Sequence, residues 1–177
     1  NLGSCTANAL AFAYQFDEKT EDFTPSRLFI YYNERKLENT VDSDSGASLR
    51  DGIKTINKIG VCNEDNWVYD PNNFSDKPPE NCYKEAKLHR TVKYHKIKQE
   101  LNQLKGCIKS GYPFVFGFSV YQSFESDEVA SNGLMPIPAK DEKLLGGHAV
   151  AAVGFDDSKK CMIIRNSWGE EWGDNGY

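Results

Sequence analysis

The sequence predicts an α+β protein made of two lobes, because helical and strand patterns occupy different parts of the chain. Apolar residues follow helical spacing through most of the first 60 residues, whereas apolar runs typical of strands lie at 113–120 and beyond 146. Helices followed by strands are typical of this class. At 177 residues, the chain is long enough for one domain or for two small lobes that share a core.

The composition argues against two classes of partner, membranes and nucleic acids. A chain with 39% hydrophobic and 27% charged residues is typical of a globular protein, and no apolar run is long enough to cross a membrane. The net charge of −5 argues against general nucleic-acid binding. We therefore expect neither a membrane nor a nucleic acid as partner, and we interpret the locally basic stretch 84–98 as a solvated face.

The first helix is expected to begin at Cys5. Ser4 before it is a good N-cap, and residues 7–16 are apolar almost all round, which predicts a largely buried helix. The free N–H groups and the positive end of the helix dipole would face the sulfur of Cys5 and favour its thiolate. The alternative is that Cys5 is a small core residue, as most free cysteines are.

Two more helices are expected in the first third of the chain. One is predicted over 24–38, with Thr24 as the N-cap and Pro25 at the first helical position. The other is predicted over 48–60, where Ser48 opens a capping box and a glycine ends the helix.

The middle of the chain mixes loops with regular elements. Residues 62–83 are expected to be irregular, 91–97 a strand that crosses between lobes, and 99–110 a helix. Residues 113–120 are apolar on both faces, which predicts an interior strand. A long polar loop is predicted over 124–145.

The end of the chain is expected to form a β-hairpin from 146–155 and 161–166. His148 starts its first strand and Asn166 ends its second, so the hairpin brings both to the same end. A neutral imidazole can accept a proton from a thiol, and an amide can hold the ring in a useful tautomer. We expect Trp168 to screen the bond between Asn166 and His148 from water.

Four segments carry a family resemblance. In chain order they are Gly3-Ser4-Cys5, His148-Ala149-Val150-Ala151-Ala152-Val153-Gly154, Asn166-Ser167-Trp168-Gly169 and Trp172-Gly173-Asp174-Asn175-Gly176-Tyr177. With these the chain resembles the papain-like, or cathepsin-like, cysteine peptidases. The resemblance implies a helical left lobe (1–93) carrying the nucleophile and an antiparallel, β-barrel-like right lobe (94–177) carrying histidine and asparagine. The active site would lie in the cleft between them.

The activity that the resemblance implies is that of a cysteine-type endopeptidase, a thiol protease that hydrolyses peptide bonds through a thioester acyl-enzyme. Cys5, His148 and Asn166 would be its catalytic residues, and protein or peptide substrates its partners. One alternative is a catalytically silent homologue that binds peptides or serves as a structural module. Another is acyl transfer to an amine by the same residues. No cofactor is expected, and the scattered Cys and His residues lack the spacing of a metal site.

Substrate-binding residues are also implied by the resemblance. The loop at Ser45, Gly46 and Ala47 would offer its backbone to an extended substrate, although the usual Gly-Gly is reduced here to one glycine. Gly117 and Ala149 would border the pocket for the substrate's second side chain. Thr6 replaces the tryptophan that commonly follows the nucleophile.

The chain departs from the secreted members of the family. Leu2 stands where they have a cysteine, and the Cys-Asn-Gly-Gly stretch that supplies its partner is absent. The departure resembles the divergent bacterial, archaeal and large-virus branch, and it leaves the compartment unassigned. Sequence does not decide the pairing of the four remaining cysteines: Cys62, Cys82, Cys107 and Cys161.

The chain is expected to be a trimmed core. A propeptide is expected outside it, and the family's oxyanion glutamine would precede Asn1.

Overall fold

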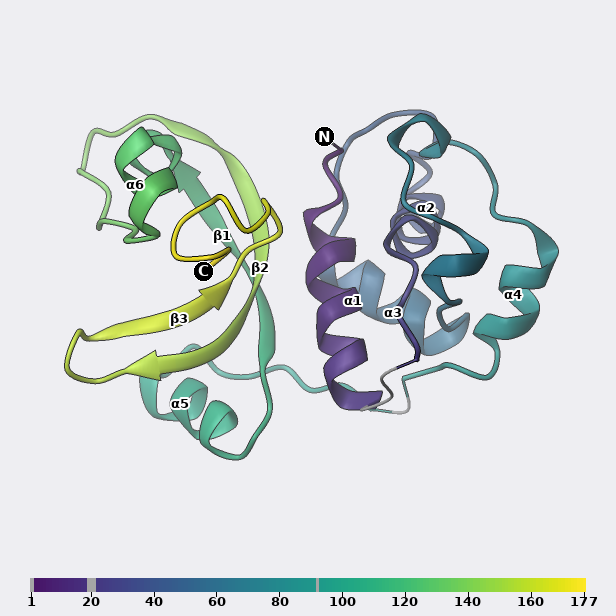
Figure 1. Cartoon of the computed structure of the whole chain (residues 1–177), viewed down its shortest axis with the longest axis horizontal. Coiled ribbons are helices and arrows are strands. Elements are labelled where there is room, and N and C mark those ends of the chain that lie inside the picture. Colours follow the sequence, from purple (N-terminus) through teal and green to yellow (C-terminus); the bar gives the residue numbers. More distant parts are fainter. Residues whose placement is uncertain (1, 19–21, 92) are drawn as a thin grey trace. The chain divides into compact units, whose positions relative to one another are not determined.

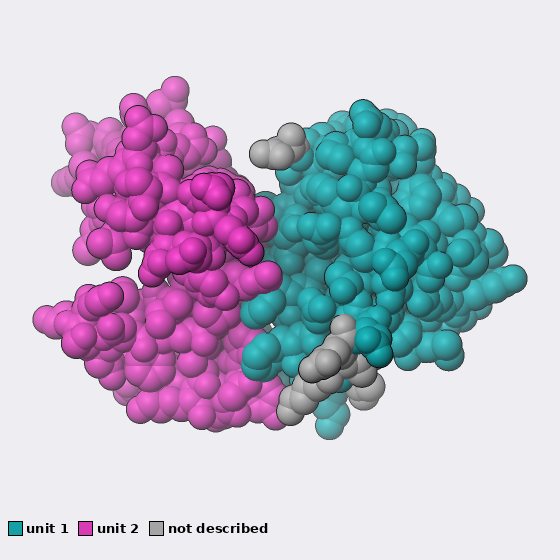
Figure 2. Space-filling model, in the orientation of Figure 1, with its two compact units in different colours: residues 1–97 teal, residues 98–177 magenta. Residues whose placement is uncertain are grey.

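The computed structural model describes residues 2–18, 22–91 and 93–177. It confirms the α+β class, with helices in the first half of the chain and an antiparallel sheet in the second. The chain divides into two compact units, residues 1–97 and 98–177, coloured separately in Figure 2. Each unit is described below by itself.

The first unit is helical. Its elements are α1 (Cys5–Glu18), α2 (Arg27–Glu38), α3 (Leu49–Lys58), α4 (Glu80–Ala86) and the short 3-10 turns η1 (Glu64–Asn66) and η2 (Pro71–Asn73). Helices α1, α2 and α3 pack against one another (Figure 1). Eight consecutive residues of α2, from Leu28 to Arg35, are buried, so this helix is the centre of the unit.

Helix boundaries in this unit follow local hydrogen bonds. Helix α1 begins at Cys5 as predicted. Helix α2 begins later than expected, because Ser26 and not Thr24 is its N-cap: the Ser26 hydroxyl accepts a hydrogen bond from the N–H of Phe29 at 3.1 Å. Pro25 instead forms an isolated β-bridge with Asn63.

The predicted capping box of α3 is wrong in its bonding. The helix follows Ser48, but the Ser48 side chain makes no capping bond. The backbone N–H of Ser48 donates to Glu38 Oε1 at 2.8 Å. The predicted stop is confirmed. Gly60 adopts a left-handed φ of 92°, and its N–H donates to the Ile56 carbonyl at 3.0 Å.

The second unit is built on a sheet. Its elements are α5 (Leu101–Lys109), β1 (Phe114–Tyr121), η3 (Gln122–Glu125), α6 (Asp127–Asn132), β2 (Leu144–Asp156) and β3 (Cys161–Arg165). The strands pair antiparallel in the order β1-β2-β3, so the predicted hairpin is formed (Figure 1). Helix α5 packs against β2, and Val129 of α6 joins the cluster at the end of β1.

Two predictions for the second half of the chain are wrong: the strand at 91–97 and the continuous loop at 124–145. No strand forms in the described part of 91–97, where the backbone has no partner strand; Val92 lies outside the described residues. The segment 124–145 is not loop throughout, because it contains α6. The Ser126 hydroxyl caps α6 by accepting from the N–H of Val129, and Gly133 ends it with a left-handed φ of 71°.

Two kinds of feature are absent from the described ranges. None of the helices there is long and apolar enough to cross a membrane. No group of three or more His, Cys, Asp or Glu side chains gathers there in a way that could hold a metal ion.

Candidate active site

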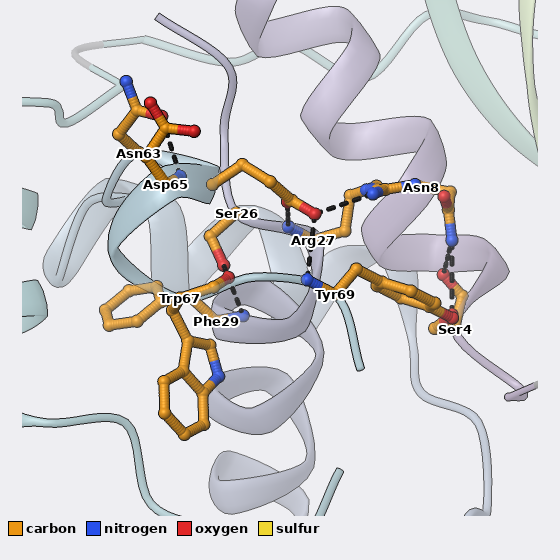
Figure 3. Close-up of polar contacts among 10 residues, drawn as sticks. Ser4, Asn8, Ser26, Arg27, Phe29, Asn63, Asp65, Trp67 and Tyr69 are labelled. Atoms are coloured by element: carbon orange, nitrogen blue, oxygen red, sulfur yellow. Dashed lines mark hydrogen bonds and ion pairs between the residues drawn. The ribbon is translucent and has the colours of Figure 1, made fainter. Parts of the chain in front are cut away.

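Cys5 is the first residue of α1, and the residue before it is firmly held. Ser4 is buried, and its hydroxyl lies 2.5 Å from the hydroxyl of Tyr69. Asn8, one turn along α1, donates its side-chain N–H to the Ser4 carbonyl at 2.9 Å and to the Ser4 hydroxyl at 3.2 Å (Figure 3). These bonds fix the start of the helix, and with it the backbone that carries the Cys5 thiol.

The carboxylate of Glu64 holds the backbone of Tyr69, whose side chain contacts Ser4. Glu64 accepts the backbone N–H of Tyr69 at 3.0 Å and the backbone N–H of Arg27 at 3.1 Å. The Arg27 guanidinium forms an ion pair with the same carboxylate at 2.6 Å and lies over the Tyr69 ring, 4.6 Å from its centroid (Figure 3). Tyr69 lies in a segment expected to be irregular, and no local sequence pattern predicts its contact with Ser4.

His148 and Asn166 are joined in the second unit. His148 lies on β2 and is 7% exposed, and Asn166 directly follows β3. His148 Nε2 and Asn166 Oδ1 are 2.8 Å apart. Because β2 and β3 pair antiparallel, with Ala151 opposite Arg165, the hairpin places both residues at one end, as expected.

The orientation of the Asn166 amide follows from a second hydrogen bond. The N–H of Ser167 donates to Asn166 Oδ1 at 2.8 Å, so this atom is the oxygen. His148 Nε2 must then carry the hydrogen that it donates to Oδ1. In the neutral ring, the lone pair consequently lies on Nδ1, the form that a proton acceptor needs.

Aromatic rings enclose His148. The Trp168 ring stacks on the imidazole with a centroid distance of 4.9 Å, and the Phe118 ring meets it edge-on at 5.8 Å. Phe124 lies 6.3 Å away. Burial lowers the pKa of His148, and the hydrogen bond to Asn166 opposes this shift. The Trp168 ring thus lies against His148, and its screening of the bond to Asn166 stays a prediction. No local pattern predicts the contacts of Phe118 and Phe124 with the imidazole.

The expected substrate-binding residues fall into two local groups. The loop at Ser45, Gly46 and Ala47 lies beside the segment before Cys5, since a Cβ built on Gly3 would be 3.3 Å from Gly46 N. The Gly46 N–H points to the Tyr31 hydroxyl at 3.3 Å, so this donor is turned inward. Gly117 and Ala149 face each other across β1 and β2 as register partners.

A buried carboxyl lies beside the first turn of α1, and no local sequence pattern predicts it. Glu34 on α2 is fully buried, and its Oε1 accepts the Thr6 hydroxyl at 2.5 Å. Its Oε2 has no hydrogen-bond partner among the described residues and faces Gly52 of α3. A Cβ built on Gly52 would lie 2.5 Å from this oxygen. Burial raises the pKa of Glu34 to about 8, and the bond from Thr6 opposes this shift only in part.

Replacing Glu34 by glutamine should change how stability depends on pH. The folded pKa of about 8 lies above the ordinary value of 4.5, so the folded state keeps a proton that the unfolded state loses. Wild-type stability should therefore fall as pH rises from about 5 to 8, by up to about 1.4 kcal/mol per pH unit from this group. Glu34→Gln should flatten this decline in thermal or urea unfolding.

The control for this prediction is Glu80→Gln, which removes an exposed carboxylate from the same unit. It should keep the wild-type slope. The charged groups nearest Glu34 are Arg35, Glu38 and Asp51 on α2 and α3, and all remain in both variants. Equal slopes for Glu34→Gln and wild type would show that Glu34 does not titrate in this range.

The four cysteines whose pairing was left open are thiols in the structure. Cys62 and Cys82 are fully buried in one cluster with Phe29 and Ala86, and burial raises the pKa of both thiols. Cys107 on α5 is half-buried, and burial raises its pKa too. These environments stabilise the unreactive protonated form.

Comparison with known proteins places these features in context. The family described as "Papain family cysteine protease" matches residues 34–177, most of the chain. An uncharacterized peptidase C1-like protein of Acanthamoeba polyphaga mimivirus is 52% identical over 188 residues, which cover 99% of this chain and 60% of that protein. The chain thus spans about three fifths of the length of this relative.

Solved structures show the same likeness. Xylellain, a cysteine protease from Xylella fastidiosa, matches with a TM-score of 0.90 and 48% identity over 99% of this chain and 72% of its own. The digestive procathepsin L 3 of Tenebrio molitor larval midgut matches with a TM-score of 0.72 at 18% identity, over 99% of this chain and 57% of its own. At that identity the second likeness concerns the fold alone.

Proposed function

The chain belongs to the papain family of cysteine proteases, and from this we propose that it is a cysteine-type endopeptidase acting through a thioester acyl-enzyme. The observation that carries the proposal is the oriented His148–Asn166 pair. Its amide is fixed by Ser167, its ring is covered by Trp168, and its Nδ1 is left as the proton acceptor. Such an arrangement is what a cysteine nucleophile needs from its base.

In the proposed reaction, Cys5 of the helical lobe is the nucleophile, and His148 of the β-rich lobe is its base. The thiolate attacks the substrate carbonyl, and the backbone N–H of Cys5 helps to hold the oxyanion. The imidazolium then gives its proton to the leaving amine, and a thioester remains on Cys5. Water, deprotonated by the same imidazole, hydrolyses this thioester and restores the thiol.

Supporting roles follow for the neighbouring residues. Asn166 holds the ring of His148, and Trp168 excludes water from the bond between them. Ser4, held by Tyr69 and Asn8, fixes the helix start below the thiol. We assign the substrate backbone to the loop of Ser45, Gly46 and Ala47, whose Gly46 carbonyl accepts a hydrogen bond from the Ser45 hydroxyl at 3.1 Å.

We also propose Gly117 and Ala149 as the border of a side-chain pocket. Neither side chain is larger than a methyl group, and the two residues face each other across β1 and β2. Protein or peptide substrates are the proposed partners, and a propeptide is proposed as a further partner. The described residues contain no feature that favours the catalytically silent alternative.

Labelling by an epoxide inhibitor of cysteine peptidases tests the proposal. Wild-type protein should incorporate one equivalent, and peptide mass spectrometry should place it on Cys5. Cys107→Ser should label like wild type, because burial raises the pKa of the Cys107 thiol and keeps it protonated. A folded protein that is never labelled, or is labelled equally on Cys107 or Cys161, would refute Cys5 as the nucleophile.

A further inference from the structure

A carboxylate joins the segment before Cys5 to the proposed substrate loop. The backbone N–H of Gly3, two residues before the nucleophile, donates to both oxygens of Asp44, at 2.9 and 3.0 Å. Asp44 directly precedes Ser45, the first residue of the loop. A hydrogen bond to a charged carboxylate is worth more than a neutral one, so this contact restrains both segments.

Tyr31 extends the contact to the middle of the loop. This residue of α2 is fully buried, its hydroxyl donates to Asp44 Oδ1, and the same hydroxyl accepts the N–H of Gly46 at 3.3 Å. Burial, followed by the bond to Asp44, raises the pKa of Tyr31 well above its ordinary value. Tyr31 therefore keeps the proton that it donates to Asp44.

Arg35, one turn further along α2, holds the preceding part of the same loop. Its Nη1 donates to the carbonyls of Val41 at 2.7 Å and Ser43 at 3.0 Å. The guanidinium lies over the Tyr31 ring, 3.9 Å from its centroid. The loop is thus fixed to the most buried helix of its unit on both sides of Asp44.

Two glycines allow the backbones to approach. A Cβ on Gly3 would lie 3.3 Å from Asp44 Oδ1, 3.3 Å from Gly46 N and 3.4 Å from Gly46 Cα. Gly46 has a left-handed φ of 71°, which favours glycine. The segment before Cys5 and the loop therefore meet backbone to backbone, and the Asp44 carboxylate reaches between them.

We propose that Asp44 is a positioning residue that sets the distance between the Cys5 thiol and a peptide bound on the loop of Ser45, Gly46 and Ala47. It links the two segments by hydrogen bonds, to the Gly3 N–H on one side and, through Tyr31, to the Gly46 N–H on the other. The inference rests on the proposed function. It adds a residue that touches neither the reacting atoms nor the substrate and acts through the two segments that do.

The test compares two reactions of the same thiol. Hydrolysis of a fluorogenic peptide needs both Cys5 and the loop, whereas alkylation by iodoacetamide needs Cys5 alone. Asp44→Ala should lower kcat/KM for the peptide by about 10- to 100-fold, because displacement of a bound substrate by about 1 Å can cost this much. The rate of alkylation should change by less than about threefold.

Two further variants keep the test decisive. Asp42→Asn removes a charge from an exposed residue of the same loop and should match wild type in both reactions. Tyr31→Phe removes only the hydroxyl that joins Asp44 to Gly46; it should lower peptide hydrolysis in the same selective way, and it replaces Asp44→Ala if that variant does not fold.

Equal losses in both reactions, or no loss in peptide hydrolysis, would overturn the role of Asp44. If Asp42→Asn lowered kcat/KM for the peptide as much as Asp44→Ala does, the role of Asp44 would also be overturned. The negative charge of the loop, and not the contact of Asp44, would then be the cause. Failure of the proposed function itself is distinguishable, because wild-type protein would then show no peptide hydrolysis at all.

Discussion

Replacing Cys5 by serine should lower kcat for peptide hydrolysis by a factor on the order of 10⁴ to 10⁶, the loss found when a nucleophile is removed from a catalytic unit. A serine hydroxyl ionises far less readily than a thiol, and a base arranged for a thiol does not compensate. Cys5 is half-buried, and the residue before it is fixed by Tyr69 and Asn8, so serine should occupy the same place. Fluorogenic peptide turnover measures the loss.

The control for Cys5→Ser is Cys107→Ser on α5. This substitution makes the same chemical change at a half-buried thiol of the other unit, and turnover should stay within about twofold of wild type. Thermal unfolding of Cys5→Ser should remain close to wild type, since one sulfur is exchanged for oxygen at a helix terminus. Turnover by Cys5→Ser at more than a few per cent of the wild-type rate would show that another group is the nucleophile.

The sequence predicted the parts of the site that depend on local signals. A small polar residue before an apolar run predicted that a helix begins at Cys5, and two apolar runs joined by a turn predicted the hairpin that unites His148 with Asn166. These predictions succeeded because neighbours in sequence determine the structure. The 91–97 strand failed for the opposite reason: alternation indicates a strand only where a partner strand exists, and none faces this segment among the described residues.

Other features depend on residues far apart in sequence, and no local pattern predicts them. Glu34 would be expected on the surface from its charge, yet α1 and α3 bury it against Thr6 and Gly52. In the sequence Asp44 is an ordinary polar loop residue. In the structure its carboxylate accepts a hydrogen bond from the backbone N–H of Gly3, 41 residues earlier. Thr24 was read as a cap because it precedes proline, but its carbonyl accepts the N–H of Glu64, and Ser26 takes the capping role.

Removing the His148 imidazole should be as damaging as removing the thiol. His148→Ala should lower kcat by a factor on the order of 10⁴ or more, because both proton transfers lose their carrier. Asn166→Ala should lower kcat/KM less, since the base remains but loses its orientation. It also removes the oxygen that stabilises the protonated ring, leaving burial to lower the pKa of His148 further.

The pH profile distinguishes this role of Asn166 from a structural one. If the imidazolium is the form that carries the reaction, the alkaline limb of kcat/KM reports its loss. Asn166→Ala should move that limb to lower pH by about one unit, the equivalent of one hydrogen bond to a charged group. Asn166→Asp keeps the acceptor for Ser167 and adds a negative charge, so the limb should move to higher pH.

Opposite displacements are the informative result, because loss of packing alone would lower the rate of both variants without moving their limbs in opposite directions. Asn102→Ala on α5, an exposed asparagine of the same unit, should leave the profile unchanged. Profiles for Asn166→Ala and Asn166→Asp that move in the same direction, or not at all, would mean that Asn166 does not set the proton affinity of His148. The pKa of His148 would then be governed by its burial among aromatic rings, those of Trp168, Phe118 and Phe124 among them.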